Sequence, residues 1–244
     1  MIHLSKRLLA VASMVTEGSR LADIGTDHAY VPIYLCLEGT IPSATAMDVK
    51  DGPLKRAVSH INEAGLSDRI EVRLSDGLEA LKAGEADTVL IAGMGGALMV
   101  RILKEGEEKL LTVNELVLQP QSEIFKVRRF LCGTGWEIAA EAVVSDSGKY
   151  YPMFRAVRKK QDEPKEDGKA PYTEADFIYG RVDLQTDKDA YKDFLEFKLC
   201  TACTVLEKLP GDGSSEDALW RRQELESEMS MLRKRIQETV EYGK

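Results

Sequence analysis

Apolar runs and amphipathic stretches alternate along the first two thirds of the chain. Strands are expected at 20–25, 44–49, 70–75, 87–92, 115–119, 136–144 and 151–158. Helical periodicity marks the segments around them, at 4–16, 29–38, 51–65, 77–83, 97–108 and 122–134. Alternation of this kind predicts a Rossmann-like α/β fold built on a parallel, doubly wound sheet.

The last two expected strands form an exception to the parallel arrangement. Only Asp146-Ser147-Gly148-Lys149 joins them, and this connection is too short for the crossover that parallel neighbours need. The pair is therefore expected to be antiparallel. Seven strands that end in an antiparallel hairpin are typical of class I methyltransferases.

The C-terminal third has a different pattern. A polar segment from Lys159 to Ala170 reads as a linker, and a break at 210–215 separates two helical stripes. The apolar positions of these stripes are Tyr191, Leu195, Leu199, Ala202, Leu206 and Leu209, then Leu225, Met229, Leu232, Ile236 and Val240. Spacings of three and four predict a coiled-coil-like antiparallel helical hairpin. We expect a sheet domain at 1–160 and a helical hairpin extension at 161–244.

The turn after the first strand carries the most specific chemistry. It contains Asp23, Gly25, Thr26, Asp27 and His28, at the place where a Rossmann-like fold holds a nucleotide-derived cofactor. A dinucleotide site needs several glycines there to receive a pyrophosphate, but only Gly25 is a glycine. The Asp27 carboxylate would repel phosphates and tolerate a cation. The turn therefore favours S-adenosylmethionine, which carries a sulfonium and an ammonium group, over NAD.

Three further strand ends carry groups that suit the same cofactor. Asp48 and Val49 follow the second strand about 20 residues after the glycine turn, the spacing of a carboxylate that accepts from ribose hydroxyls. Asp76 and Gly77 follow the third, where a carboxylate could accept from an adenine amine. The fourth ends in a glycine-rich loop of Gly93, Met94, Gly95 and Gly96. Taken singly, these residues could be helix caps, turns or packing glycines. Their occurrence at successive strand ends favours one binding site.

Bulk composition sets limits on the partners. The chain has 244 residues, of which 43% are hydrophobic and 30% charged. It contains no apolar run long enough for a membrane span and no signal-peptide pattern. Its four scattered cysteines suit a reducing cytoplasm. Cys200 and Cys203 lie inside a helical stripe without a second pair, so we expect a structural role and no metal. The oligomeric state is not fixed by sequence, and a monomer is expected.

Charge is distributed unevenly. Residues 1–160 hold 20 Lys and Arg against 21 Asp and Glu, a net of −1, and residues 161–244 hold 13 against 20, a net of −7. The first part is thus free to carry a local basic face for nucleic acid. The candidates for substrate contact are Lys6, Arg7, Gln119, Tyr150 and Tyr151. The two tyrosines lie at a hairpin turn that faces the site, where a ring could stack on a base.

The chain resembles the bacterial tRNA (adenine-22-N1)-methyltransferases. The resemblance rests on the segments 23–30, 75–78 and 92–96 together with Asp48, and it extends from Leu4 to about Arg158. It implies methyl transfer from S-adenosylmethionine to N1 of adenine 22 in the D-arm region of tRNA. Residues 1–160 would then be the cofactor-binding catalytic domain.

The catalytic candidates lie in the first turn. Adenine N1 has an in-plane lone pair, so attack on the methyl group needs no base and depends largely on alignment. Asp27 is the candidate for stabilising the ring as it becomes cationic, and His28 and Tyr30 are placed beside it. The target base must open out of its contacts to be reached.

Two other classes of function remain open from the residues alone. A class I methyltransferase acting on a small molecule or protein would share the cofactor site. A non-catalytic module that binds a nucleotide and docks partners through the hairpin would suit the hairpin's acidic surface and apolar stripe. An NAD-dependent oxidoreductase is a third reading, against which Asp27 weighs.

Overall fold

A computed structural model of the chain describes residues 2–159, 171–209 and 216–242. It divides into two compact units, Met1–Pro171 and Tyr172–Lys244. The expected domain boundary at 160, most of the polar linker and the break at 210–215 lie outside the described residues. Among the residues that are described, no helix is long and apolar enough to cross a membrane.

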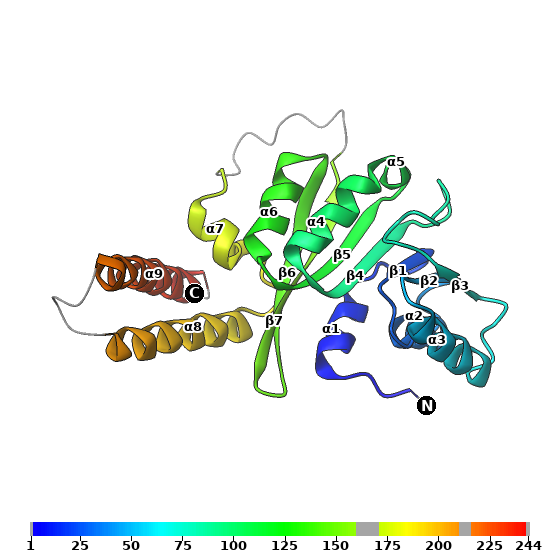
Figure 1. Ribbon diagram of the computed structural model, residues 1–244, viewed down its shortest axis with the longest axis horizontal. Helices are drawn as coiled ribbons and strands as arrows, with labels where there is room; N and C mark the ends of the chain where they lie inside the picture. The colour runs from blue at the N-terminus through cyan, green and yellow to red at the C-terminus, as the bar shows by residue number, and fades with distance from the viewer. Residues whose placement is uncertain (1, 160–170, 210–215, 243–244) are drawn as a thin grey trace. The chain divides into compact units, whose positions relative to one another are not determined.

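A seven-stranded sheet forms the centre of the first unit (Figure 1). Its order is β3-β2-β1-β4-β5-β7-β6. The strands from β1 to β5 run parallel, and β7 is antiparallel to both β5 and β6. This confirms the predicted sheet and its terminal hairpin. The bounds are β1 Leu21–Ile24, β2 Ala44–Asp48, β3 Ile70–Leu74, β4 Thr88–Gly95, β5 Glu115–Ser122, β6 Trp136–Asp146 and β7 Lys149–Arg158.

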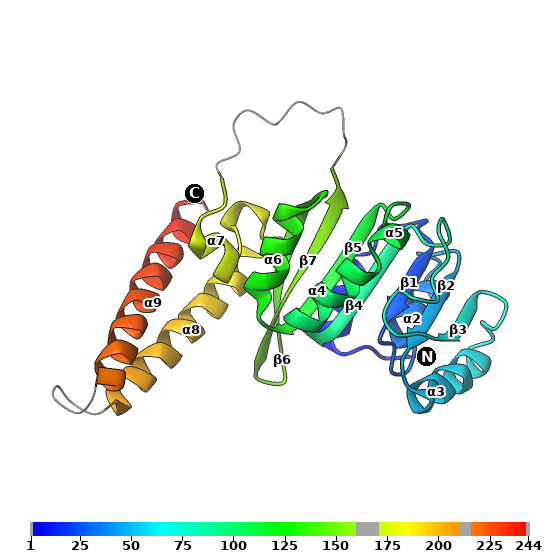
Figure 2. The same cartoon turned by 45° about the horizontal axis from the view of Figure 1, so that its top comes forward.

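Helices cover both faces of this sheet (Figure 2). Leu90 of β4 and Val117 of β5 join the core that α1, α2 and α3 build on one face. Ile91 and Leu118 are also fully buried, and alternation along a strand turns them to the opposite face, under α4 and α6. The bounds are α1 Lys6–Ser13, α2 Tyr30–Leu37, α3 Asp51–Glu63, α4 Gly96–Glu105, α5 Glu107–Leu110 and α6 Ile124–Gly133.

The prediction of a helix at 77–83 is wrong. Gly77 has a φ of 58°, in the left-handed region, and the segment continues as turns. The Ser75 hydroxyl organises these turns, because it donates to the Gly77 carbonyl at 3.0 Å and accepts from the Ala80 amide at 3.0 Å. The side chains of Leu78 and Leu81 are buried, and these turns rather than a helix place them in the core.

The stretch expected as a helix over 97–108 forms two helices. α4 ends at Glu105 because Gly106 breaks the helix where Leu78 packs closely against it. A Cβ on Gly106 would lie 2.4 Å from Leu78 Cδ1. The hairpin connection is also tighter than expected: Ser147 and Gly148 alone form it, with φ values of 52° and 74°, as in a type I′ turn.

The second unit is helical. It comprises α7 Glu174–Tyr179, the short helix η1 Val182–Leu184, α8 Lys188–Lys208 and α9 Glu216–Glu241, and α8 packs along α9. Leu225, Met229 and Leu232 are buried as expected. The last two turns differ, because Arg235 and Thr239 are buried there and Val240 is 48% exposed. Near the C-terminal end of α9, the buried face is therefore shifted by one residue from the predicted apolar stripe.

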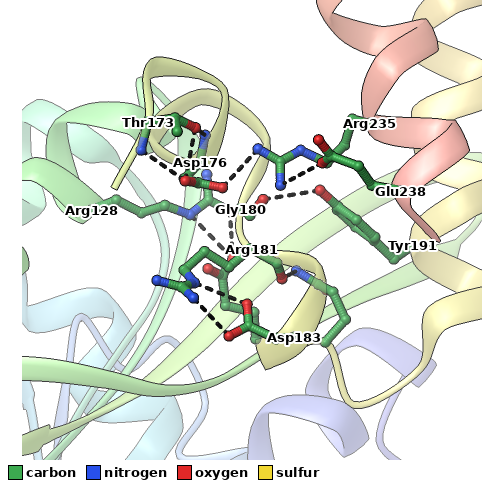
Figure 3. A network of polar contacts seen from close by, with 11 residues as sticks. Arg128, Thr173, Asp176, Gly180, Arg181, Asp183, Tyr191, Arg235 and Glu238 are labelled. Atoms are coloured by element: carbon green, nitrogen blue, oxygen red, sulfur yellow. Dashed lines mark hydrogen bonds and ion pairs between the residues drawn. The ribbon is translucent and has the colours of Figure 1, made fainter. Parts of the chain in front are cut away.

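A polar network holds the start of this unit together (Figure 3). Thr173 caps α7, and its amide and hydroxyl both donate to Asp176 in a capping box. Arg235 of α9 donates to the other oxygen of Asp176 at 2.7 Å and pairs with Glu238 at 3.2 Å. The Tyr191 hydroxyl of α8 donates to the Gly180 carbonyl at 3.0 Å. Asp176 thus joins a helix cap to a nearly buried ion pair.

Replacing Arg235 should loosen this unit. Arg235→Ala leaves the Asp176 carboxylate, 11% exposed, without its cationic partner, and we expect a loss of about 3 kcal/mol in local stability. Native-state hydrogen exchange of α9 amides measures the change. Arg233→Ala, at an exposed position of the same helix, is the matched control and should leave exchange unchanged. Equal protection in the two variants would contradict the role given to the buried pair.

Candidate functional site

The turn after β1 is built on backbone contacts to β2. The amides of Gly25 and Thr26 both donate to the Met47 carbonyl, at 2.7 and 2.9 Å. Gly25 has a φ of 76°, which favours glycine, and a Cβ there would lie 2.1 Å from Met94 Cε. The Thr26 hydroxyl accepts from the Ala29 amide at 3.1 Å and so leads the chain into α2. The turn therefore has a fixed shape at the end of β1.

Asp23 lies just inside this turn and is almost fully buried, at 8% exposure. Desolvation raises the pKa of its carboxyl to about 6, and the charge of Asp48 adds to the increase, while a hydrogen bond with Thr26 opposes it. A buried carboxyl of this kind gains from a nearby positive charge. It is the most strongly perturbed acid at the strand ends.

Asp27 has the opposite environment. It is exposed, and Arg56 of α3 donates to its Oδ1, while His28 Nε2 lies 3.3 Å from its Oδ2. The hydrogen bond from Arg56 lowers the pKa of Asp27 below its ordinary value. The same turn thus holds one buried and one exposed carboxylate with opposite shifts.

Three rings gather beside Asp27. The rings of His28 and Tyr30 are nearly parallel, with centroids 4.8 Å apart, and His60 of α3 lies 5.1 Å from each. His60 Nδ1 lies 3.3 Å from the His28 carbonyl oxygen. His28 Nδ1 is buried and has no hydrogen-bond partner among the residues that the structure describes. The structure thus brings the three catalytic candidates, Asp27, His28 and Tyr30, into one cluster.

Arg56 and His60 are missed as individual site residues by sequence reasoning. They lie four residues apart on α3, a spacing that places two side chains on one helical face. That spacing was the available signal, because Arg56 faces Asp27 and His60 faces the two rings.

The ends of β2 and β3 are more open. Asp48 Oδ1 accepts from the Lys50 amide at 2.8 Å, and Val49 is 57% exposed. Asp76 lies 3.6 Å from Arg101, and a Cβ on Gly77 would lie 3.0 Å from an Ile102 side-chain carbon. Both carboxylates lie at the edge of the sheet where the β1 turn is found.

The glycine-rich segment after the fourth strand is not the loop expected from sequence. β4 continues through Gly95, and β5 pairs with it as far as Ser122. Gly93 has a φ of 79°. Gly96 begins α4, where a Cβ would lie 2.6 Å from the carbonyl oxygens of both Ser122 and Glu123. Close packing against these two carbonyls therefore explains why a glycine stands at position 96.

Arg7 joins several of the expected substrate residues. Its Nη1 donates to Gln119 Oε1 at 2.8 Å, its amide donates to Asp146 Oδ2 at 3.1 Å, and its guanidinium lies 5.5 Å from the centre of the Tyr151 ring. Two of the candidates lie outside this group of contacts: Lys6 is exposed in α1 and Tyr150 is half-buried in the hairpin. Among the described residues, no group of three metal-ligating side chains is placed to hold an ion.

Comparison with known proteins gives a consistent result. A family model described as a methyltransferase domain matches residues 4–154. The tRNA (adenine(22)-N(1))-methyltransferase of Bacillus subtilis is 40% identical over 161 residues, which cover 66% of this chain and 68% of the relative.

Two solved structures are similar over nearly their whole length. The crystal structure of the B. subtilis m1A22 tRNA methyltransferase TrmK has a TM-score of 0.81 and 32% identity, with 97% of this chain and 100% of that chain covered. Streptococcus pneumoniae Sp1610 in complex with S-adenosyl-L-methionine has a TM-score of 0.79 and 31% identity, with 95% and 99% covered. With the strand-end carboxylates and the glycine turn, these similarities establish that the chain belongs to the family of the bacterial tRNA (adenine(22)-N(1))-methyltransferases.

Proposed function

We propose that this chain transfers the methyl group of S-adenosylmethionine to N1 of adenine 22 in tRNA. The activity named for the B. subtilis relative, at 40% identity, supports the choice of target. The geometry of the strand ends supports the choice of cofactor and the type of reaction.

The residues at the strand ends fit S-adenosylmethionine. The buried Asp23, whose pKa is raised, gains from a cationic group, and the cofactor's ammonium supplies one. Asp48 can accept from ribose hydroxyls, and Asp76 from the adenine amine. Gly25 adopts the positive φ that the turn requires and leaves room for the Met94 side chain against it. Carboxylates at the ends of three strands suit a cationic cofactor better than a pyrophosphate.

The observation that carries the reaction type is the end of β4. When bound, the cofactor supplies an electrophilic sulfonium methyl group. Gly93, Met94 and Gly95 offer no side chain that could remove a proton from the substrate. Adenine N1 needs no such base, because its lone pair lies in the plane of the ring. The protein's contribution is then to align N1 with the methyl group.

Asp27 can stabilise the product-like ring. Methylation makes the adenine cationic, and an ionised carboxylate nearby lowers the energy of that charge. Arg56 orients the ionised Asp27, since it donates to one carboxylate oxygen, and this hydrogen bond lowers the pKa of Asp27 further. The adjacent rings of His28 and Tyr30 offer flat surfaces to a base that has left its stack.

The first test is to map the methylated nucleoside. Unmodified tRNA incubated with the protein and S-adenosylmethionine should gain one methyl group, found by mass spectrometry as N1-methyladenosine at position 22. A tRNA with guanine at position 22 is the control and should gain none. Methylation at another position, or of no RNA, would refute the proposal.

Cofactor affinity should depend on the protonation of Asp23. The folded pKa of about 6 lies above the unfolded value of about 3.9, so the apo protein favours the neutral acid between these values. A bound ammonium favours the carboxylate instead, so affinity should weaken roughly tenfold per pH unit as pH falls below 6. Calorimetric titration between pH 5 and 7 measures this. Asp23→Asn should bind more weakly and lose the pH dependence.

The exposed Asp68 supplies the matched control for Asp23. Asp68→Asn should keep the wild-type pH dependence. The interpretation of Asp23 is wrong if Asp23→Asn and Asp68→Asn give the same profile.

Removing the charge of Asp27 should affect turnover more than binding. Asp27→Asn keeps the shape of the side chain, and we expect kcat to fall by about 100-fold while the cofactor Kd stays within about twofold. Single-turnover methylation and calorimetry measure the two quantities. Glu38→Gln, exposed at the end of α2, is the control. Full turnover in Asp27→Asn would show that the charge of Asp27 does not stabilise the transition state.

A further inference from the structure

Two bulged residues face each other where β4 and β5 end. Ala92 pairs with Gln119, Met94 with Pro120, and Gly95 with Ser122. Gly93 is therefore an extra residue in β4 and Gln121 an extra residue in β5. Bulges redirect side chains and occur often beside active sites. Gln121 is the member of this pair that has a side chain to redirect.

The two glutamines of this strand end differ in their partners. Gln119 is fully buried, its Oε1 accepts from Arg7, and its Nε2 donates to the Pro120 carbonyl at 3.2 Å. Gln121 is exposed, and its amide makes no hydrogen bond to the residues that the structure describes. Gln119 therefore orients Arg7, while Gln121 retains both a donor and an acceptor.

The free amide lies close to the cofactor turn. A Cβ on Gly93 would lie 3.6 Å from Gln121 Nε2 and 3.7 Å from Arg7 Nη1. The next residue, Met94, reaches the Gly25 turn with its terminal methyl group. Because β1 and β5 flank β4 in the sheet, Gln121 and the β1 turn lie on either side of the end of β4. This is where the base and the methyl donor of the proposed reaction must meet.

We propose that Gln121 recognises the target adenine through its N6 amine and N7, and so selects adenine while leaving N1 open to the methyl group. This inference rests on the proposed function. A glutamine amide pairs with adenine by accepting from N6 and donating to N7. N1 lies on the other side of N6 and takes no part in that pair. Recognition and reaction then use different edges of one base.

The same geometry disfavours guanine. Guanine presents an acceptor, O6, where adenine presents the N6 donor, so the Gln121 oxygen would face another acceptor. Arg7 cannot supply this discrimination, because a guanidinium has donors only. The assignment makes Gln121 a specificity-determining residue that contacts the base rather than a group that moves a proton.

The test pairs a change in the protein with a change in the base. Wild type, Gln121→Ala and Gln119→Ala are each assayed on tRNA that carries adenine or 7-deazaadenine, which lacks the N7 acceptor, at position 22. The measured quantity is the ratio of kcat/KM for 7-deazaadenine to that for adenine. Comparing this ratio between variants cancels the altered basicity of N1, which acts equally on every variant.

We expect Gln121→Ala to lower kcat/KM on adenine by about 30-fold and to raise the ratio about tenfold over wild type. Gln119→Ala should lower activity on both substrates and keep the wild-type ratio, since its amide is engaged within the protein. Gln121→Glu, which keeps the acceptor and loses the donor, should raise the ratio as the alanine variant does. Unchanged cofactor affinity and melting temperature show that the Gln121 variants are folded.

An unchanged ratio in Gln121→Ala overturns the assignment, as does a ratio that rises equally in Gln119→Ala. These outcomes are separate from failure of the proposed function. That failure would appear as wild-type protein that leaves adenine 22 unmethylated, whatever the state of residue 121.

Discussion

The burial of one carboxylate, Asp23, governs the organisation of the candidate site. A buried acid beside the glycine turn holds its proton up to a pH of about 6, and it becomes favourable as an anion when a cation comes near. The fold places this acid at the end of the central parallel strand and surrounds it with backbone that Met47 holds in place. Under the proposed function, the ammonium of S-adenosylmethionine supplies the positive charge that favours the Asp23 carboxylate.

The reaction itself makes small demands on the protein. A nucleophile with a lone pair in the ring plane needs alignment, and Gly93, Met94 and Gly95 at the bulged end of β4 carry no titratable side chain. The β1 turn, which leads to Asp27, His28 and Tyr30, and the end of β5, which carries Gln121, flank the end of β4 in the sheet.

Much of this arrangement can be predicted from the sequence, because parallel strands impose continuous apolar runs and leave polar groups at their ends. The sheet, its antiparallel hairpin, and the gathering of Asp27, His28 and Tyr30 follow from such patterns. The errors come from contacts between distant segments. Ser75 and Gly77 form turns where periodicity favoured a helix, and Arg235 takes a buried position in α9 because Asp176 compensates its charge.

Other site residues were missed for a related reason. Arg56 and His60 belong to a helix that reads as amphipathic, and only the tertiary packing of α3 brings them to the β1 turn. Gln121 cannot be identified without the strand register. The sequence Gln119-Pro120-Gln121 does not show which side-chain amide is hydrogen-bonded within the protein and which is available to a ligand. Sequence patterns predict where strands end. The register of the hydrogen-bonded strands determines which side chains at those ends can face a ligand.

The two bulges at the ends of β4 and β5 also constrain how this family can change. Gly93 adds one residue to its strand and Gln121 adds one to the neighbouring strand, so the offset between the strands returns to its earlier value at Gly95 and Ser122. A deletion at either position alone would shift the pairing that follows and displace Gly96 from the carbonyls against which α4 begins. The two extra residues are therefore expected to be gained or lost together, as a single inherited unit.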